Sequence, residues 1–214
     1  MTEHLSAVQA WELAQLGKAS IVDVRGPSKF ALGHPLGALS LPFSPKGLAE
    51  RLAMVFQSDT PVILVSEDPD QAEAAALQLK DGGLSAIYVV GESIDVWHEN
   101  DLPMETLAEV SVQEISEALA AGNTVVLDVR ESMEWDMGHV PGATLISLGA
   151  LRERLHEVPQ ASRIVVICEA GVRSCSAASI LQASGFVDVV NVPEGTGGYR
   201  NAGLPLQIPE PGPD

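Results

Sequence analysis

Two halves of this chain carry the same motifs in the same order, and this repeat constrains the fold more than any other feature. The early motif pairs differ in position by 105 residues and the later ones by 102, because the first half is three residues longer between them. Such regular spacing indicates a duplicated structural unit. The pairs are 22–25 and 127–130, 33–34 and 138–139, 37–38 and 142–143, 61–65 and 163–167, 83 and 185, and 102–103 and 204–205.

The repeat predicts two domains joined between residues 103 and 110. We place the first at 1–105, the second at 106–208 and a flexible, proline-rich tail at 209–214. A chain of 214 residues, 46% of them hydrophobic, can supply a core for each domain.

Each unit alternates apolar strand patterns with helical ones. Strands separated by helices predict the α/β class, with a mainly parallel sheet flanked by helices in each unit. Ligands of such sheets bind at the carboxyl ends of the strands. In the first unit we expect helices at 7–16, 48–55 and 71–80 and strands at 20–24, 38–41, 61–65 and 86–90. In the second we expect helices at 112–121, 148–158 and 174–183 and strands at 124–129, 143–146, 163–167 and 187–192.

A cysteine stands at one of these strand ends. Cys168 follows the buried apolar run 164–167, and the loop after it contains Gly171 and ends at Arg173. Backbone N–H groups and the dipole at a helix start favour anions and stabilise a thiolate placed there. Gly171 lets the loop bend so that its N–H groups converge. Ser174 either caps the helix or donates to a bound anion.

The repeat also serves as an internal control. His139 suggests a Cys–His pair, but His34 holds the same place in the half without a thiol, so we expect the Gly-His turn to be scaffold. Asp128 and Arg130 are mirrored in the same way, and we expect them to fix the strand end locally. Their counterparts are Asp23 and Arg25.

The remaining polar candidates are less specific. Glu134 has Lys29 as its counterpart, and its role is open. Arg152 and Arg154 could supply positive potential, although such residues are more often a solvated helix face. Cys175 is expected to be a small buried residue, unpaired with Cys168 because the two lie seven residues apart.

The first unit has lost the thiol loop. Ser66, Glu67, Asp68, Pro69 and Asp70 stand where residues 168–172 stand in the second unit. Serine supplies no thiolate, the carboxylates repel an anion, and proline removes one N–H group from the cradle. The sequence therefore predicts that the first unit is catalytically inactive.

Charge and hydropathy exclude several classes of protein. A net charge of −17 and a pI near 4.5 argue against nucleic acid as a partner. No apolar run reaches the length of a membrane span, and the N-terminus lacks the pattern of a signal peptide. We therefore expect a cytoplasmic protein with no membrane partner. Two cysteines are too few for a structural zinc site or a disulfide scaffold.

Taken together, these motifs resemble the tandem rhodaneses, which are sulfurtransferases. The resemblance rests on 128–131, 134–135, 138–143, the loop 168–174 and the ending 197–205. It implies that Cys168 takes a sulfane sulfur from a small donor such as thiosulfate and, as a persulfide, passes it to cyanide, a thiol or a protein acceptor. It also implies that Arg173 and the backbone of Glu169, Ala170, Gly171, Val172 and Ser174 bind the anion, without metal or organic cofactor.

Two other functions stay open. Phosphatases and arsenate reductases of related architecture use a thiol loop, but the phosphatase loop is one residue longer than the four residues between Cys168 and Arg173. A binding module that relays sulfur or regulates a partner protein is the other. Glu169 is unexplained, because a carboxylate beside the thiol opposes thiolate formation and repels thiosulfate.

Overall fold

The computed structural model describes residues 2–56, 60–121, 124–159 and 163–209, and these fold into two compact units, Met1–Thr106 and Leu107–Asp214. All but Pro209 of the expected tail at 209–214 lies outside the described residues. No helix among the described residues has the length and apolar character needed to cross a bilayer.

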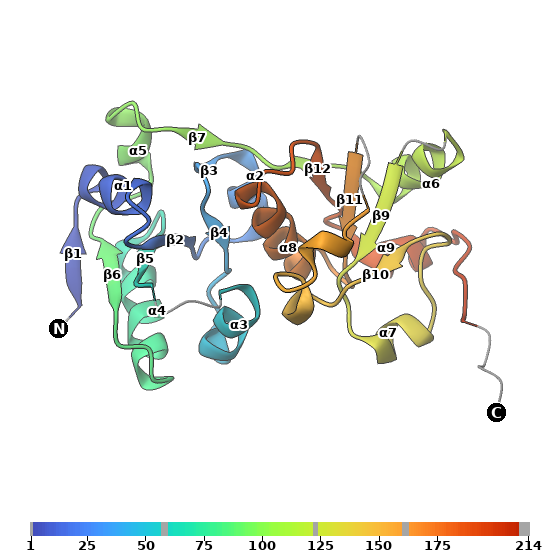
Figure 1. Ribbon diagram of the computed structural model, residues 1–214, viewed down its shortest axis with the longest axis horizontal. Helices are drawn as coiled ribbons and strands as arrows, with labels where there is room; N and C mark the ends of the chain where they lie inside the picture. Colours follow the sequence, from blue (N-terminus) through green and yellow to red (C-terminus); the bar gives the residue numbers. More distant parts are fainter. Residues whose placement is uncertain (1, 57–59, 122–123, 160–162, 210–214) are drawn as a thin grey trace. The chain divides into compact units, whose positions relative to one another are not determined.

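The first unit is built on a five-stranded sheet with the order β1-β6-β5-β2-β4, and every pairing in it is parallel. The central strand β5 is buried at all four positions, which explains its unbroken apolar sequence. Helices α1 and α5 cover one face of the sheet, and α3 and α4 cover the other (Figure 1). The strands are β1 (Glu3–Leu5), β2 (Ser20–Asp23), β4 (Leu39–Ser40), β5 (Val62–Val65) and β6 (Ile87–Val90), and the helices are α1 (Ala7–Gln15), α2 (Pro27–Leu32), α3 (Leu48–Val55), α4 (Pro69–Asp81) and α5 (Asp95–Glu99).

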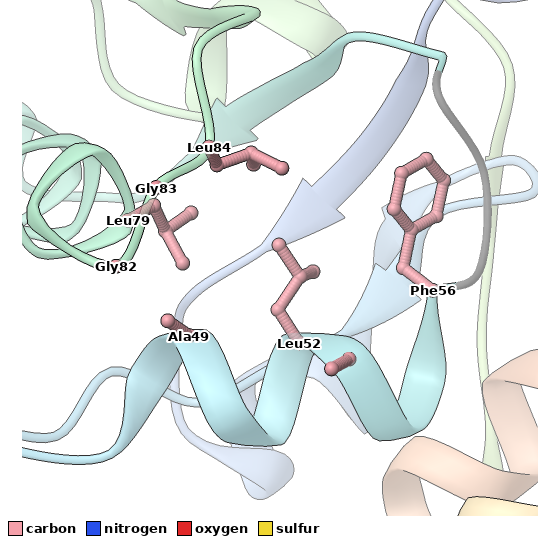
Figure 2. Close-up of a pocket in the computed structure, with 8 residues that line it drawn as sticks. Ala49, Leu52, Phe56, Leu79, Gly82, Gly83 and Leu84 are labelled. Carbon is pink, nitrogen blue, oxygen red and sulfur yellow. The ribbon is translucent and has the colours of Figure 1, made fainter.

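Two short strands, β3 (His34–Pro35) and β7 (Met104–Glu105), pair antiparallel at the end of this unit. Helix α3 packs closely against the end of α4. A Cβ atom on Gly82 would lie only 2.4 Å from the Cβ atom of Ala49. Beside this contact is a hollow of about 250 Å³ (Figure 2). The described residues that line it, which include Leu52, Phe56 and Leu79, carry no ionisable or nucleophilic side chain.

The second unit repeats the design. Its sheet has the order β10-β9-β11-β12-β8, again parallel throughout, and strands at equivalent places in the two sheets come from equivalent parts of the sequence. Helix α8 lies on one face, and α6 and α9 lie on the other (Figure 1). The strands are β8 (Ala108–Glu109), β9 (Thr124–Asp128), β10 (Thr144–Leu145), β11 (Arg163–Ile167) and β12 (Val189–Asn191), and the helices are α6 (Val112–Ala121), α7 (Ser132–Asp136), α8 (Val172–Ala183) and α9 (Gly195–Asn201).

The predicted α/β class with mainly parallel sheets flanked by helices is therefore confirmed. The edge strands β1 and β8 were not predicted, nor were the short helices α2, α5, α7 and α9. The expected helix at 148–158 is wrong. That segment forms two single 3₁₀ turns, η1 (Leu148–Ala150) and η2 (Leu155–Glu157).

The sequence of this segment explains the difference. Gly149 weakens an α-helix, and the second unit is three residues shorter here than the first, where α3 does form. Leu148 is tied to the end of β9 because its N–H donates to the carbonyl oxygen of Val129. Arg154 and Glu157 form an ion pair three residues apart, and a 3₁₀ turn places side chains at this spacing directly above one another.

Candidate active site

Cys168 lies directly after β11, the central strand of the second sheet, and its side chain is buried at 2% exposure. The chain turns at Gly171 and enters α8 at Val172. Ala170 and Val172 are exposed on the outer side of this turn. The predicted strand–loop–helix arrangement around the thiol is therefore present, with the helix beginning two residues earlier than expected.

Gly171 is required at the turn for two reasons. Its φ of 78° lies in the left-handed region, which side chains disfavour. A Cβ atom there would lie 2.5 Å from the carbonyl oxygen of Pro193, a backbone atom that cannot move aside. Gly171 therefore allows both the bend and the close approach of the segment that follows β12.

Ser174 is not the helix cap, so that alternative is wrong. Gly171 is the N-cap residue and provides no side-chain hydrogen bond, while Ser174 lies inside the first turn of α8. The hydroxyl oxygen of Ser174 is fully buried, 3.3 Å from the sulfur of Cys168. A hydroxyl at this distance can donate to a thiolate.

Arg173 is held by a carboxylate. Its two terminal nitrogens donate to the two oxygens of Glu134, both at 2.6 Å. The hydrogen bonds from Arg173 lower the pKa of Glu134 to about 2, and the same pair raises the pKa of Arg173. Glu134 thus acquires a role that the sequence left open, and the guanidinium expected to bind an anion already has an anionic partner.

Glu169 points away from the thiol toward helix α9. Thr196 donates its hydroxyl to one carboxylate oxygen at 2.7 Å, and Arg200 pairs with the other. Arg130 lies 3.8 Å away. Burial raises the pKa of Glu169, but the hydrogen bonds from Thr196 and Arg200 and the charges of Arg200 and Arg130 outweigh it, so the net shift is downward. The carboxylate that seemed misplaced is a fixed anion.

Sequence reasoning missed Thr196 and Arg200. Comparing the two halves could have found them, because the equivalent positions in the first unit are Ile94 and His98. The pairing of Thr196 and Arg200 with the carboxylate of Glu169 is therefore particular to the second unit. The backbone contact, by contrast, is common to both halves. Thr196 N–H donates to the carbonyl oxygen of Cys168 at 2.8 Å, and Ile94 N–H donates to that of Ser66 at 2.9 Å.

The residues predicted to be scaffold are scaffold in both halves. Arg130 donates to Asp128 and to the carbonyl oxygen of Gly138, and Arg25 makes the same bonds to Asp23 and Gly33. His139 and His34 each bond the carbonyl oxygen of a ring residue four positions earlier and stack on that ring, Trp135 in one unit and Phe30 in the other. Neither histidine is needed to explain the thiol.

The equivalent loop of the first unit is closed by its own side chains. Asp68 accepts from the N–H of Asp70 at 3.0 Å and caps α4, and Pro69 has no N–H group. Ser66 donates to the side chain of Gln71, which occupies the position of Arg173. Lys29, the counterpart of Glu134, pairs with Glu67 of this loop. The loop therefore contributes the anion of the pair here, whereas in the second unit it contributes the cation, Arg173.

A hollow of about 400 Å³ lies beside the thiol loop. Met137 supplies its apolar wall. Its polar lining comes from Arg130, Glu134, Glu169 and Arg200. The hollow therefore presents charges of both signs next to the thiol loop.

The remaining sequence candidates are the second cysteine and two arginines. Cys175 is fully buried, and no disulfide joins it to Cys168. Arg154 pairs with exposed Glu157, and burial lowers the pKa of Arg152. Within the described residues, no group of three or more His, Cys, Asp and Glu side chains is arranged to bind a metal.

The fold and the site define a twofold α/β repeat with a thiol at the start of one helix, and family comparison names this class. The model of the rhodanese-like domain matches residues 6–100 and again 111–202. The chain belongs to the rhodanese-like family and carries two such domains.

Individual relatives agree with the family. A sulfurtransferase of Allochromatium vinosum is 30% identical over 103 residues, which are 48% of this chain and 96% of that protein. A candidate sulfur carrier of Bacillus subtilis, YrkF, is 33% identical over 91 residues, 42% of this chain. The match covers only 49% of YrkF. A solved rhodanese-like protein of Staphylococcus aureus is 27% identical, with a TM-score of 0.44, over 49% of this chain and all of its own.

Proposed function

We propose that this protein is a sulfurtransferase in which Cys168 carries the transferred sulfur as a persulfide. The observation that carries the proposal is the thiol itself. Cys168 sits at the end of the central strand and the start of α8, with Ser174 3.3 Å from its sulfur and an arginine in the first helical turn. Membership of the rhodanese-like family supports the same chemistry.

The transfer runs in two steps. The thiolate of Cys168 attacks the outer sulfur of the donor, a sulfur–sulfur bond forms on the enzyme, and the donor's own bond to that sulfur breaks. The leaving group, sulfite if the donor is thiosulfate, departs with the electron pair. An acceptor, cyanide or a thiolate, then attacks the outer sulfur and releases the Cys168 thiolate. The early N–H groups of α8, which have no intrahelical acceptor, stabilise the anionic sulfur in both steps.

We propose that the two domains, 1–105 and 106–208, divide structure from catalysis. The first has serine at the position of Cys168, and Asp68 already occupies an N–H group of the helix start. It therefore neither forms a persulfide nor binds the anion. The backbone groups of Glu169, Ala170, Gly171, Val172 and Ser174, with Arg173, serve the second domain alone.

A sulfur relay to a protein acceptor is the second candidate, since one relative is described as a candidate sulfur carrier. Cys168 would then be loaded by a donor but turn over slowly with cyanide or small thiols. The spacing of four residues between Cys168 and Arg173 argues against a phosphatase, whose loop must enclose a phosphate.

Thiocyanate production from thiosulfate, an organic persulfide and a thiosulfonate tests the function. Cys168→Ser is expected to abolish it with every donor, and Cys175→Ser is the matched control that retains it. Undiminished activity in Cys168→Ser would disprove the proposal. Hydrolysis of an aryl phosphate by the wild-type protein would favour the phosphatase instead.

A further inference from the structure

Three arginines near the thiol loop each form an ion pair with a carboxylate. Within each pair the guanidinium lies at hydrogen-bonding distance from its carboxylate, and Arg130 also lies 3.8 Å from a carboxylate oxygen of Glu169. The pairs are Arg130 with Asp128, Arg173 with Glu134, and Arg200 with Glu169.

These carboxylates are fixed in place. Glu134 is held by both nitrogens of Arg173 and also accepts from the N–H of Glu131 at 3.1 Å. Glu169 is held by Thr196 and Arg200 and lies next to Cys168 in the chain. Both line the hollow beside the loop. An approaching donor therefore meets fixed carboxylates beside the arginines that pair with them, so these ion pairs offer it no net positive charge, in a protein whose net charge is −17.

Building on the proposed sulfur transfer at Cys168, we propose that Glu169 and Glu134 make the site selective against dianionic sulfur donors. Thiosulfate brings two negative charges, and the sulfite it releases carries two as well. A persulfide anion or a thiosulfonate brings one and releases one. Because each of these arginines is balanced by a carboxylate, the second charge of a dianion gains no net attraction from the pairs, and neutralising one carboxylate would leave its arginine able to attract that charge. The favoured substrate class is a monoanionic organic donor.

The step balances without an oxidant or reductant. The Cys168 thiolate attacks the outer sulfur of R–S–S⁻, the new sulfur–sulfur bond forms, and the bond between the two donor sulfurs breaks. The electron pair leaves on R–S⁻, which takes a proton from solvent. Two negative charges are present before and after the sulfur transfer itself, and protonation of R–S⁻ then removes one of them.

Two matched donors test the selectivity. Methanethiosulfonate and thiosulfate share a sulfane sulfur on a tetrahedral sulfur and differ by a methyl group in place of one anionic oxygen. The measurement is the second-order rate constant for sulfur loading of Cys168 in the full-length protein, followed by intact mass. Glu169→Gln and Glu134→Gln are each expected to lower the preference for methanethiosulfonate about tenfold, mainly by accelerating thiosulfate.

The control variant is Glu117→Gln, because Glu117 is exposed on α6 and does not line the hollow. It removes the same charge from the molecule and is expected to leave the ratio unchanged. A salt titration of the wild-type protein needs no variant. Rising ionic strength should accelerate thiosulfate more than methanethiosulfonate, since screening weakens repulsion.

Normal loading of Cys168 with ratios unchanged in both glutamine variants would overturn the selectivity and leave sulfur transfer standing. Thiosulfate loading that slows with salt would do the same, because it would indicate attraction. Loading from neither donor, and none from an organic persulfide, would overturn the sulfurtransferase function and the selectivity with it.

Discussion

The loops after β11 and β5 follow equivalent strands and accept equivalent backbone hydrogen bonds, but their side chains make different contacts. Both receive a backbone hydrogen bond from the segment after the last strand, and both follow an Asp–Arg pair that fixes the neighbouring strand end. In the second unit the helix start has no side-chain cap, whereas in the first Asp68 caps it. The comparison teaches that the duplicated fold supplies the same helix start twice, and that a few side chains decide whether its N–H groups are capped from within the loop.

Moving the thiol into the first unit is the strongest way to break this comparison. The double variant Ser66→Cys with Cys168→Ser keeps one thiol at a strand end, but the loop around it retains Asp68 and Pro69. We expect sulfur transfer at least about 10³-fold below wild type, because the nucleophile lacks the anion-binding groups. Recovery of substantial thiocyanate production would show that the thiol alone suffices.

Gly171→Ala is expected to lower activity about 10²-fold, because misplacing the loop by a fraction of an ångström misaligns the thiol. The new Cβ atom would lie 2.5 Å from the oxygen of Pro193 and would also require an unfavourable φ. Gly185→Ala is the matched control, since its φ is 90° but nothing lies within 4 Å of the new atom.

That control should cost about 1 kcal/mol of stability and leave sulfur transfer intact. Thermal unfolding and steady-state activity measured on both variants separate the two effects. Equal activity losses in the two would mean that the crowding at Pro193 has no functional role.

The pair of Glu134 with Arg173 should stabilise the second unit in a pH-dependent way. The pKa of Glu134 is lowered to about 2 in the folded protein, so its contribution is complete above its ordinary value near 4.5 and is lost as the pH falls toward about 2. We expect Glu134→Gln to lower the free energy of unfolding by about 1–2 kcal/mol at neutral pH, allowing for solvent screening.

Denaturant titrations of the wild-type protein and Glu134→Gln across this pH range measure the difference, which should shrink toward pH 2. Glu157→Gln removes a similar but exposed ion pair and should show no measurable effect. A Glu134 difference that does not change with pH would contradict the ionic origin.

Ser174→Ala should produce the smallest effect. Removing the hydroxyl 3.3 Å from the Cys168 sulfur takes away one donor to the thiolate, and we expect alkylation by iodoacetamide to slow about threefold. Ser176→Ala is the control on the same helix, because the Ser176 hydroxyl bonds the carbonyl oxygen of Val172 instead. Equal rates in the two variants would remove Ser174 from the account.

The sequence predicted best what repeats and what is buried. The apolar runs of β5 and β11 identify central strands because both faces of a parallel sheet are covered. Comparing the halves also identified His34, His139 and the Asp–Arg pairs as scaffold. Helix α9 escaped prediction because glycines at 195, 197 and 198 give it a poor intrinsic helix propensity.

The site contacts were harder to predict because they join distant parts of the chain. Glu169 meets Arg200 across 31 residues, and Arg173 meets Glu134 across 39. No local pattern encodes such a pair, since it depends on how α7 and α9 approach the loop. The charges themselves were visible in the sequence, but their mutual neutralisation was not.

The central claim is that one sulfur atom resides on one cysteine, and peptide mass measurement tests it most directly. Trypsin cleaves after Arg163 and Arg173, so Cys168 and Cys175 fall on different peptides. After incubation with a sulfane donor and alkylation, the account predicts one added sulfur on the peptide 164–173 and none on the peptide of Cys175. Sulfur on Cys175, or none on Cys168 with any donor, would contradict it.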